Sequence, residues 1–226
     1  MSGKVDFDEH TENYNKLLRE SVGFFSENDA YFARYKVELV HKAIPAPPAR
    51  ILEYGCGIGR NIPFLKQYFP DAVIEGSDVS PASLDMARQE HPDNTFFLED
   101  GSYEGEGYDL IFVASVYHHI PPAERQAATN SLAKRLKPGG SVYVFEHNPY
   151  NPVTRRIVNN CIYDADAVLL KPAELKSLIR KADLDLTALA YCLFIPPKLS
   201  ALIWMEKHLG WLPLGGQYWV CATRPG

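Results

Sequence analysis

The chain has 226 residues, of which 46% are apolar and 23% charged, the balance of a globular domain. Its formal net charge of −5 argues against nucleic acid as the main partner, because domains that bind nucleic acid usually carry a basic face. The polar N-terminal stretch and the lack of a long apolar run argue against a signal peptide and an integral membrane segment, so we expect a cytoplasmic protein.

The N-terminal part of the chain is predicted to be helical. Residues 31–40 place apolar side chains at close to helical spacing, and the prolines at 45, 47 and 48 end this segment. We therefore predict a helical cap over residues 1–45 and a second unit over residues 46–226.

After these prolines, strand-like and helix-like segments alternate. Strands are predicted at 49–54, 72–77, 94–99, 108–115 and 141–146, with helices ending near 68, 90 and 137. Two further strands, 185–195 and 217–224, enclose a helix at about 198–209, and an irregular insertion at 147–170 continues as a short helix. Such alternation indicates a parallel sheet, whose ligands bind at the carboxyl ends of the strands.

Three alternate glycines, Gly55, Gly57 and Gly59, follow the first strand and precede a helix. Bare backbone N–H groups at a helix N-terminus suit either a dinucleotide or the carboxylate of S-adenosylmethionine. The dinucleotide motif G-x-G-x-x-G/A requires Gly or Ala where this chain has Arg60 or Ile62. This spacing argues against a nicotinamide oxidoreductase.

The stretch E-Y-G-C-G-I-G-R resembles the first motif of class I S-adenosylmethionine-dependent methyltransferases. Four later stretches occur in the order of that family: Asp78 after the second strand, LEDGS (98–102), SVYHHI (115–120) and LKPGG (136–140). The resemblance implies an α/β fold of three layers with a Rossmann-like sheet. That sheet would have seven mostly parallel strands in the order 3-2-1-4-5-7-6, with strand 7 antiparallel.

The resemblance also implies S-adenosyl-L-methionine as cofactor. Glu53 would face its methionine amino group and Asp78 its ribose, while Asp100, or the adjacent Glu99, would meet the adenine. The full predicted cofactor-binding set is Glu53, Gly55, Cys56, Gly57, Asn61, Asp78, Val79, Asp100, Gly101, Ser102 and Ser115.

Two adjacent histidines, His118 and His119, follow the fourth strand, beside the place where the family holds the transferred methyl group. Either is a candidate general base, because an ordinary histidine accepts a proton near neutral pH. The alternative is that they pack under the loop or cap the next helix. No metal site is predicted, because the four cysteines have no C-x-x-C spacing and no carboxylate lies at ligand spacing from the pair.

The methyl acceptor is predicted to be a small, partly apolar molecule held between the N-terminal cap and two strand ends. The predicted substrate-binding residues are Tyr14, Tyr31, Tyr117, Glu146, His147 and Tyr150. A rigid loop without a binding role is the alternative for residues 146–152. The apolar segment 199–212 is expected to serve as core or lid, with peripheral membrane contact as the alternative, and the oligomeric state stays open.

The predicted function is methyl transfer to an oxygen or nitrogen of a small molecule. Two alternatives are kept: a protein that binds S-adenosylmethionine without catalysis, and a C-methyltransferase acting on a quinone-like or lipid-linked acceptor.

Overall fold

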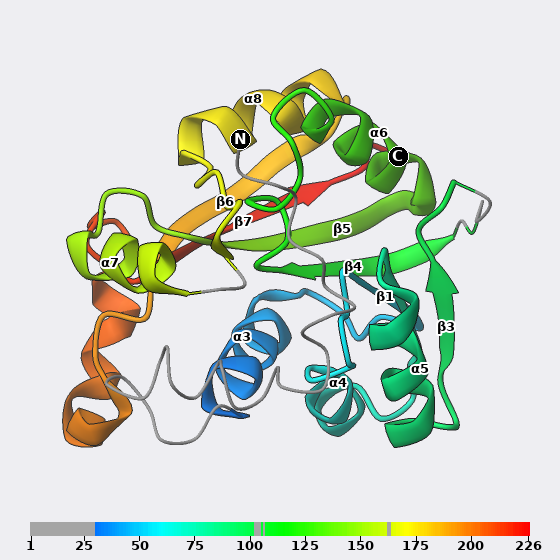
Figure 1. The fold of residues 1–226 in the computed structure, drawn as a ribbon, viewed down its shortest axis with the longest axis horizontal. Helices are drawn as coiled ribbons and strands as arrows, with labels where there is room; N and C mark the ends of the chain where they lie inside the picture. The colour runs from blue at the N-terminus through cyan, green and yellow to red at the C-terminus, as the bar shows by residue number, and fades with distance from the viewer. Residues whose placement is uncertain (1–29, 102–104, 106, 162–163) are drawn as a thin grey trace.

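The computed structural model describes residues 30–101, 105, 107–161 and 164–226, and the account below concerns these residues. They form a seven-stranded sheet in the order β3-β2-β1-β4-β5-β7-β6, flanked by helices (Figure 1). Strands β1 to β5 pair in parallel, and β7 is antiparallel to both β5 and β6. The predicted fold class, strand order and reversed strand are all confirmed.

The strands are β1 Arg50–Tyr54, β2 Val73–Asp78, β3 Thr95–Leu98, β4 Tyr108–Ala114, β5 Leu136–His147, β6 Asp185–Cys192 and β7 Gln217–Thr223. The helices are α3 Ala30–Ala43, α4 Ile62–Tyr68, α5 Pro81–Glu90, α6 Arg125–Arg135, α7 Pro152–Asn160 and α8 Pro172–Lys181, together with the 3₁₀ segment η3 Pro197–His208.

The central strand β4 shows why the sheet needs helices on both faces. Its buried side chains alternate, so that Leu110 and Phe112 join one apolar core while Ile111 and Val113 join another. Helices α3, α4 and α5 cover the first core, and α6 and α8 cover the second (Figure 1). The continuous apolar run in the sequence is therefore the mark of a strand that is covered on both sides.

Helix α3 belongs to the same core as the sheet. Its buried residues Ala33, Lys36, Val37 and Val40 form one stripe, and Val37 and Val40 pack in the cluster that contains Ile51 of β1. The described part of the predicted cap is thus packed against the sheet. Residues 1–29, which include Tyr14, lie outside the described residues, and the predicted division at residue 45 stays a prediction.

Three local predictions differ from the structure. Helix α7 was not predicted, because residues 147–170 were expected to be irregular, whereas α8 is the short helix expected to continue that insertion, with the buried Leu175, Leu178 and Ile179 at helical spacing. The expected helix near 198–209 is 3₁₀ rather than α-helical, with a kink at Leu199. Strand β5 begins at Leu136, five residues earlier than expected, because Leu136 already pairs with Tyr108 of β4.

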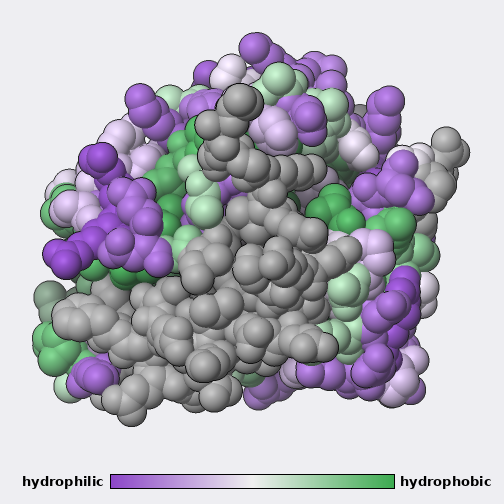
Figure 2. Space-filling view, viewed as in Figure 1, coloured by the Kyte–Doolittle hydropathy of each residue, from purple (hydrophilic) through white to green (hydrophobic). Residues whose placement is uncertain are grey.

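Hydrophilic residues dominate the visible surfaces of α5, α7 and α8 (Figure 2), as expected for the outer faces of covering helices. Within the described residues, no helix is both long enough and apolar enough to cross a membrane.

Candidate active site

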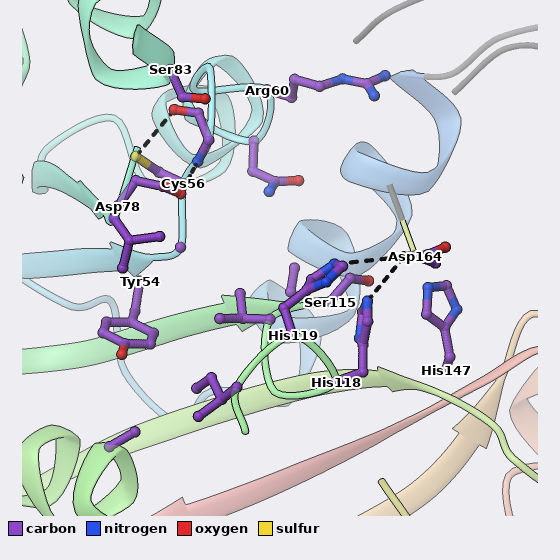
Figure 3. Close-up of a pocket in the computed structure, with 18 of the residues that line it drawn as sticks. Tyr54, Cys56, Arg60, Asp78, Ser83, Ser115, His118, His119, His147 and Asp164 are labelled. Atoms are coloured by element: carbon purple, nitrogen blue, oxygen red, sulfur yellow. Dashed lines mark hydrogen bonds and ion pairs between the residues drawn. The ribbon is translucent and has the colours of Figure 1, made fainter. Parts of the chain in front are cut away.

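A cavity of about 830 Å³ opens at the carboxyl ends of β1, β2, β4 and β5. It extends from the glycine loop to the histidines that follow β4 and to His147 at the end of β5 (Figure 3). Of the predicted cofactor-binding residues, eight line it: Gly55, Cys56, Gly57, Asn61, Asp78, Val79, Gly101 and Ser115. The location matches the general rule for ligands in parallel α/β sheets.

The glycine loop has a backbone that other residues rarely adopt. Gly55, Gly57 and Gly59 have φ values of 71°, 53° and 81°. A Cβ on Gly55 would collide with the side chain of Val116, whereas a Cβ on Gly57 would meet no atom within 4 Å. Gly57 therefore leaves open space in the cavity wall, which a bound ligand can fill.

The carboxylate of Asp78 is held by this loop and by the start of α5. Its two oxygens accept hydrogen bonds from the backbone N–H groups of Gly57 (2.7 Å) and Ser80 (2.9 Å). Burial raises the pKa of Asp78, and these bonds act in the opposite direction. Because each carboxylate oxygen has a second lone pair, Asp78 can still accept from a ligand hydroxyl.

Glu53 belongs to β1, just before the glycine loop; it is 1% exposed and is not among the residues that line the cavity. Its Oε1 accepts a hydrogen bond of 2.6 Å from the Asn61 amide, but its buried Oε2 has no hydrogen-bond partner among the described residues. Burial raises the pKa of Glu53 to about 8. An acceptor oxygen left unpaired in this way is suited to a cationic group of a ligand, such as an amino group.

At the end of β3 the structure separates the two acidic candidates for the adenine site. Glu99 lines the cavity and forms two hydrogen bonds, 2.6 and 2.9 Å long, with Arg135. Asp100 is exposed and lies outside the cavity wall, so the geometry favours Glu99 at this position. Ser102 lies outside the described residues.

His118 is fully buried between two carboxylates. Its Nδ1 lies 2.7 Å from Glu146 Oε2, and its Nε2 lies 3.3 Å from Asp164 Oδ1. Burial lowers the pKa of this imidazole, but the two carboxylates outweigh burial and raise it to about 9. The other oxygen of Glu146 accepts from the backbone N–H groups of Val116 (3.0 Å) and Tyr117 (2.8 Å), which shapes the loop after β4.

Two more histidines surround the same aspartate (Figure 3). His119 Nε2 lies 3.5 Å from Asp164 Oδ1, and its Nδ1 lies 3.4 Å from Asp166. The rings of His118 and His147 have centroids 4.9 Å apart, and burial together with His118 lowers the pKa of His147 to about 4. Asp164, with a pKa lowered to about 2 by its histidine neighbours despite burial, was not singled out in the sequence.

The predicted substrate-binding residues divide into two groups. His147 lines the cavity, and Glu146 lies directly behind His118. Tyr31 and Tyr150 are not part of the wall, and Tyr150 is 51% exposed.

The prediction for Tyr117 needs correction, because its side chain is 1% exposed and its hydroxyl lies 3.0 Å from Thr129 Oγ1 within the core. It packs in the apolar core beneath α6, together with Leu132 and Leu136.

Lys36 is a cavity residue that sequence analysis missed. Helix α3 contributes Phe32, Ala33 and Lys36 to the wall, and Lys36 is only 7% exposed. Burial lowers the pKa of its amine to about 8, more than the nearby Glu146 and Glu53 raise it. The sequence feature that could have identified Lys36 is its position on the apolar stripe of α3, where a charged side chain is unexpected.

Comparison with known proteins identifies the family to which the chain belongs. The sequence model of a family described as a methyltransferase domain matches residues 25–189. Trans-aconitate 2-methyltransferase from Methylobacterium nodulans is 34% identical over 113 residues, which are 49% of this chain and 43% of that protein. The chain spans about half the length of the curated relatives it matches.

Solved structures share the fold over nearly the whole chain. Magnesium protoporphyrin IX methyltransferase from Synechocystis, with bound S-adenosylhomocysteine, has a TM-score of 0.65 at 17% identity and covers 97% of this chain and 100% of that one. A TehB-like S-adenosylmethionine-dependent methyltransferase from Corynebacterium glutamicum has a TM-score of 0.64 at 17% identity, covering 96% and 99%.

Proposed function

Because the chain belongs to the methyltransferase domain family, we propose that it transfers the methyl group of S-adenosylmethionine to a carboxylate oxygen of a small organic acid. One observation carries this proposal. A single cavity is lined both by the proposed donor-binding residues of the glycine loop with Asp78 and by the buried cation of Lys36, which lies near Glu53 and Glu146.

The residues of the donor end fit the cofactor. Gly57 leaves open space, Asp78 retains acceptor capacity for hydroxyls, and Glu53 has an unpaired buried oxygen for an amino group. When bound, the cofactor supplies an electrophilic methyl group on a sulfonium sulfur. The contribution of these residues is to hold the donor in one orientation, which can account for much of the rate acceleration of a displacement.

Lys36 favours an anionic acceptor. A buried ammonium whose charge is not fully compensated by neighbouring carboxylates is stabilised by an anion that enters the cavity. Relatives over half the chain are named trans-aconitate 2-methyltransferase, and this supports the choice of an organic acid. An ionised carboxylate loses no proton on methylation, so the proposed reaction requires positioning and no general base.

The test is turnover with donor that carries a ¹³C-labelled methyl group and a panel of small acids, trans-aconitate among them, with phenols and amines as comparison. The expected result is S-adenosylhomocysteine together with a labelled methyl ester, identified by its carbon chemical shift. A labelled methyl group on a nitrogen or carbon atom of the acceptor would contradict the proposed methyl ester and show N- or C-methylation instead. Tight binding of S-adenosylhomocysteine without turnover on any acceptor class would favour the non-catalytic alternative.

A further inference from the structure

We propose that His118, His147 and Asp164 bind one divalent transition-metal ion, with a coordination position open to the cavity. One oxygen of Asp164 and one nitrogen from each ring all lie within 4.8 Å of one another. Each of the three residues also lines the cavity (Figure 3). They come from three separate segments: the turn after β4, the end of β5 and the chain that follows α7.

One distance in this group, between His118 and Asp164, suits a coordination sphere better than a hydrogen bond, and the three donor atoms lie within 4.8 Å of one another, so that binding an ion would draw them closer together. His118 Nε2 and Asp164 Oδ1 are 3.3 Å apart. A charge-assisted hydrogen bond between an imidazolium and a carboxylate is typically about 2.7–2.9 Å long. Two ligands bound tetrahedrally to zinc at about 2.0–2.1 Å are separated by about 3.3 Å. The observed separation is therefore that of two neighbouring ligands around one ion.

The orientation of His118 is already determined by a residue outside the ligand set. Its Nδ1 lies 2.7 Å from Glu146 Oε2, so the other ring nitrogen is the one directed at Asp164. Glu146 is held in turn by the backbone N–H groups of Val116 and Tyr117. A carboxylate behind the distal nitrogen of a histidine is the usual support of a metal ligand, because it fixes the tautomer and strengthens the donor atom.

His147 has a comparable neighbour in Gln217. The amide nitrogen of Gln217 lies 3.5 Å from His147 Nδ1 and 3.5 Å from Ser115 Oγ, while its buried Oε1 has no partner among the described residues. In the flipped amide orientation, the oxygen would accept the Nδ1 proton of His147. The Nε2 lone pair of His147 would then be available to the ion.

The chemistry of the ligands selects the ion. Two imidazoles and one carboxylate suit zinc and its first-row neighbours, whereas magnesium and calcium prefer oxygen ligands. With neutral imidazoles, Glu146 and Asp164 carry two negative charges, which match a divalent cation. Three protein ligands with a remaining open position are typical of catalytic rather than structural zinc sites.

The open position also suggests how such an ion would be used. An oxygen of the acceptor would coordinate there while Lys36 faces the same cavity. This use rests on the proposed function, whereas metal binding itself does not.

The experiment measures metal binding by the full chain, purified without a histidine tag and freed of metal by a chelator. Zinc is titrated in competition with a chromophoric chelator, and cobalt is followed by its visible d–d absorption. We expect one zinc per chain and an intense cobalt spectrum typical of four-coordination. Magnesium at the same concentrations should not displace cobalt.

Two variants, His147→Gln and Asp164→Asn, should each weaken zinc binding at least 100-fold, with unchanged far-ultraviolet circular dichroism and unchanged affinity for S-adenosylhomocysteine. His208→Gln is the matched control, because His208 is exposed and remote in sequence from the cluster, and it should bind zinc like the parent chain. Using two substitutions keeps the test valid if one variant fails to fold.

Absence of stoichiometric zinc and cobalt binding would overturn the site, as would equal binding by both variants and the parent. Stoichiometric binding without any methyl transfer would keep the metal site and remove the proposed function. Methyl transfer by a chain that binds no metal would keep the proposed function and remove the metal site.

Discussion

His118 and Glu146 are 28 residues apart in the chain, yet their side chains meet at 2.7 Å between Nδ1 and Oε2, with 1% and 0% exposure. The contact joins the turn after β4 to the end of β5, since these two strands are parallel neighbours in the sheet. The same carboxylate accepts two backbone N–H groups of that turn. Glu146 therefore determines both the shape of the turn and the orientation of the imidazole.

Glu146→Gln should lower the free energy of unfolding by roughly 3 kcal/mol, because it removes the nearer of the two carboxylates that hold the buried His118 imidazole. Urea denaturation followed by circular dichroism measures this loss. Glu90→Gln, at the exposed end of α5, is the control and should change stability by less than about 0.5 kcal/mol. A Glu146→Gln variant as stable as the control would show that this pair contributes nothing net.

Asp78→Ala should weaken the binding of S-adenosylhomocysteine by about 2 kcal/mol, the scale of a charge-assisted hydrogen bond. Isothermal titration calorimetry gives the affinity. Asp85→Ala on the outer face of α5 removes an exposed carboxylate and should leave the affinity unchanged. Equal affinity in the two variants would place Asp78 outside the donor site.

Gly57→Val should abolish S-adenosylhomocysteine binding without unfolding the domain, because the new side chain enters open cavity space. Both Gly57 (φ 53°) and Gly139 (φ 80°) have left-handed backbones, and an added Cβ meets nothing within 4 Å at either. Gly139→Val therefore carries the same backbone cost, about 1–2 kcal/mol, away from the cavity. Loss of binding in both variants would trace the effect to strain, and normal binding by Gly57→Val would mean that the loop is only a turn.

The affinity for S-adenosylhomocysteine should rise with pH up to about pH 8. Burial raises the pKa of Glu53 to about 8, so at pH 6 the free protein holds this carboxyl protonated. A ligand ammonium favours the ionised form, so binding must expel a proton below that pH, at a free-energy cost of about 1.4 kcal/mol per pH unit.

Calorimetry of this binding in buffers of different ionisation enthalpy should show proton release at pH 6.5. Glu53→Gln should abolish both the release and the slope. A flat pH profile for the parent chain would show that Glu53 does not meet the amino group.

Lys36→Met should lower kcat/KM for the acid acceptor by about 10- to 100-fold, equivalent to roughly 1.5–3 kcal/mol for a hydrogen bond to a charged group. The affinity for S-adenosylhomocysteine should hold, since the lysine is assigned to the acceptor end. Lys66→Met, at an exposed position of α4, is the matched control. If Lys36→Met lowered kcat/KM equally for a neutral acceptor, Lys36 would not act by recognising an anion.

Features that depend on neighbouring residues could be predicted from the sequence. The alternation of strands and helices indicates the parallel sheet, and three alternate glycines between a strand and a helix indicate a turn with left-handed backbone, which the structure has. Ser80 followed by Pro81 is a sequence pattern typical of a helix start, and in the structure the Ser80 side chain caps α5 by accepting the Ser83 N–H. Asp78 at the end of β2 reaches the glycine loop because β1 and β2 are adjacent.

Features that depend on distant segments required the tertiary structure. Spacing along the chain argued against a metal, yet Asp164 and His147 reach His118 from 46 and 29 residues away, because sequence separation does not limit proximity at the end of a sheet. The direction of single side chains, such as Tyr117 inward and Glu99 rather than Asp100 toward the cavity, follows from local twist and packing. Lys36 enters the cavity only because the apolar stripe of α3 docks on β1, and this docking sets which face of the helix is buried.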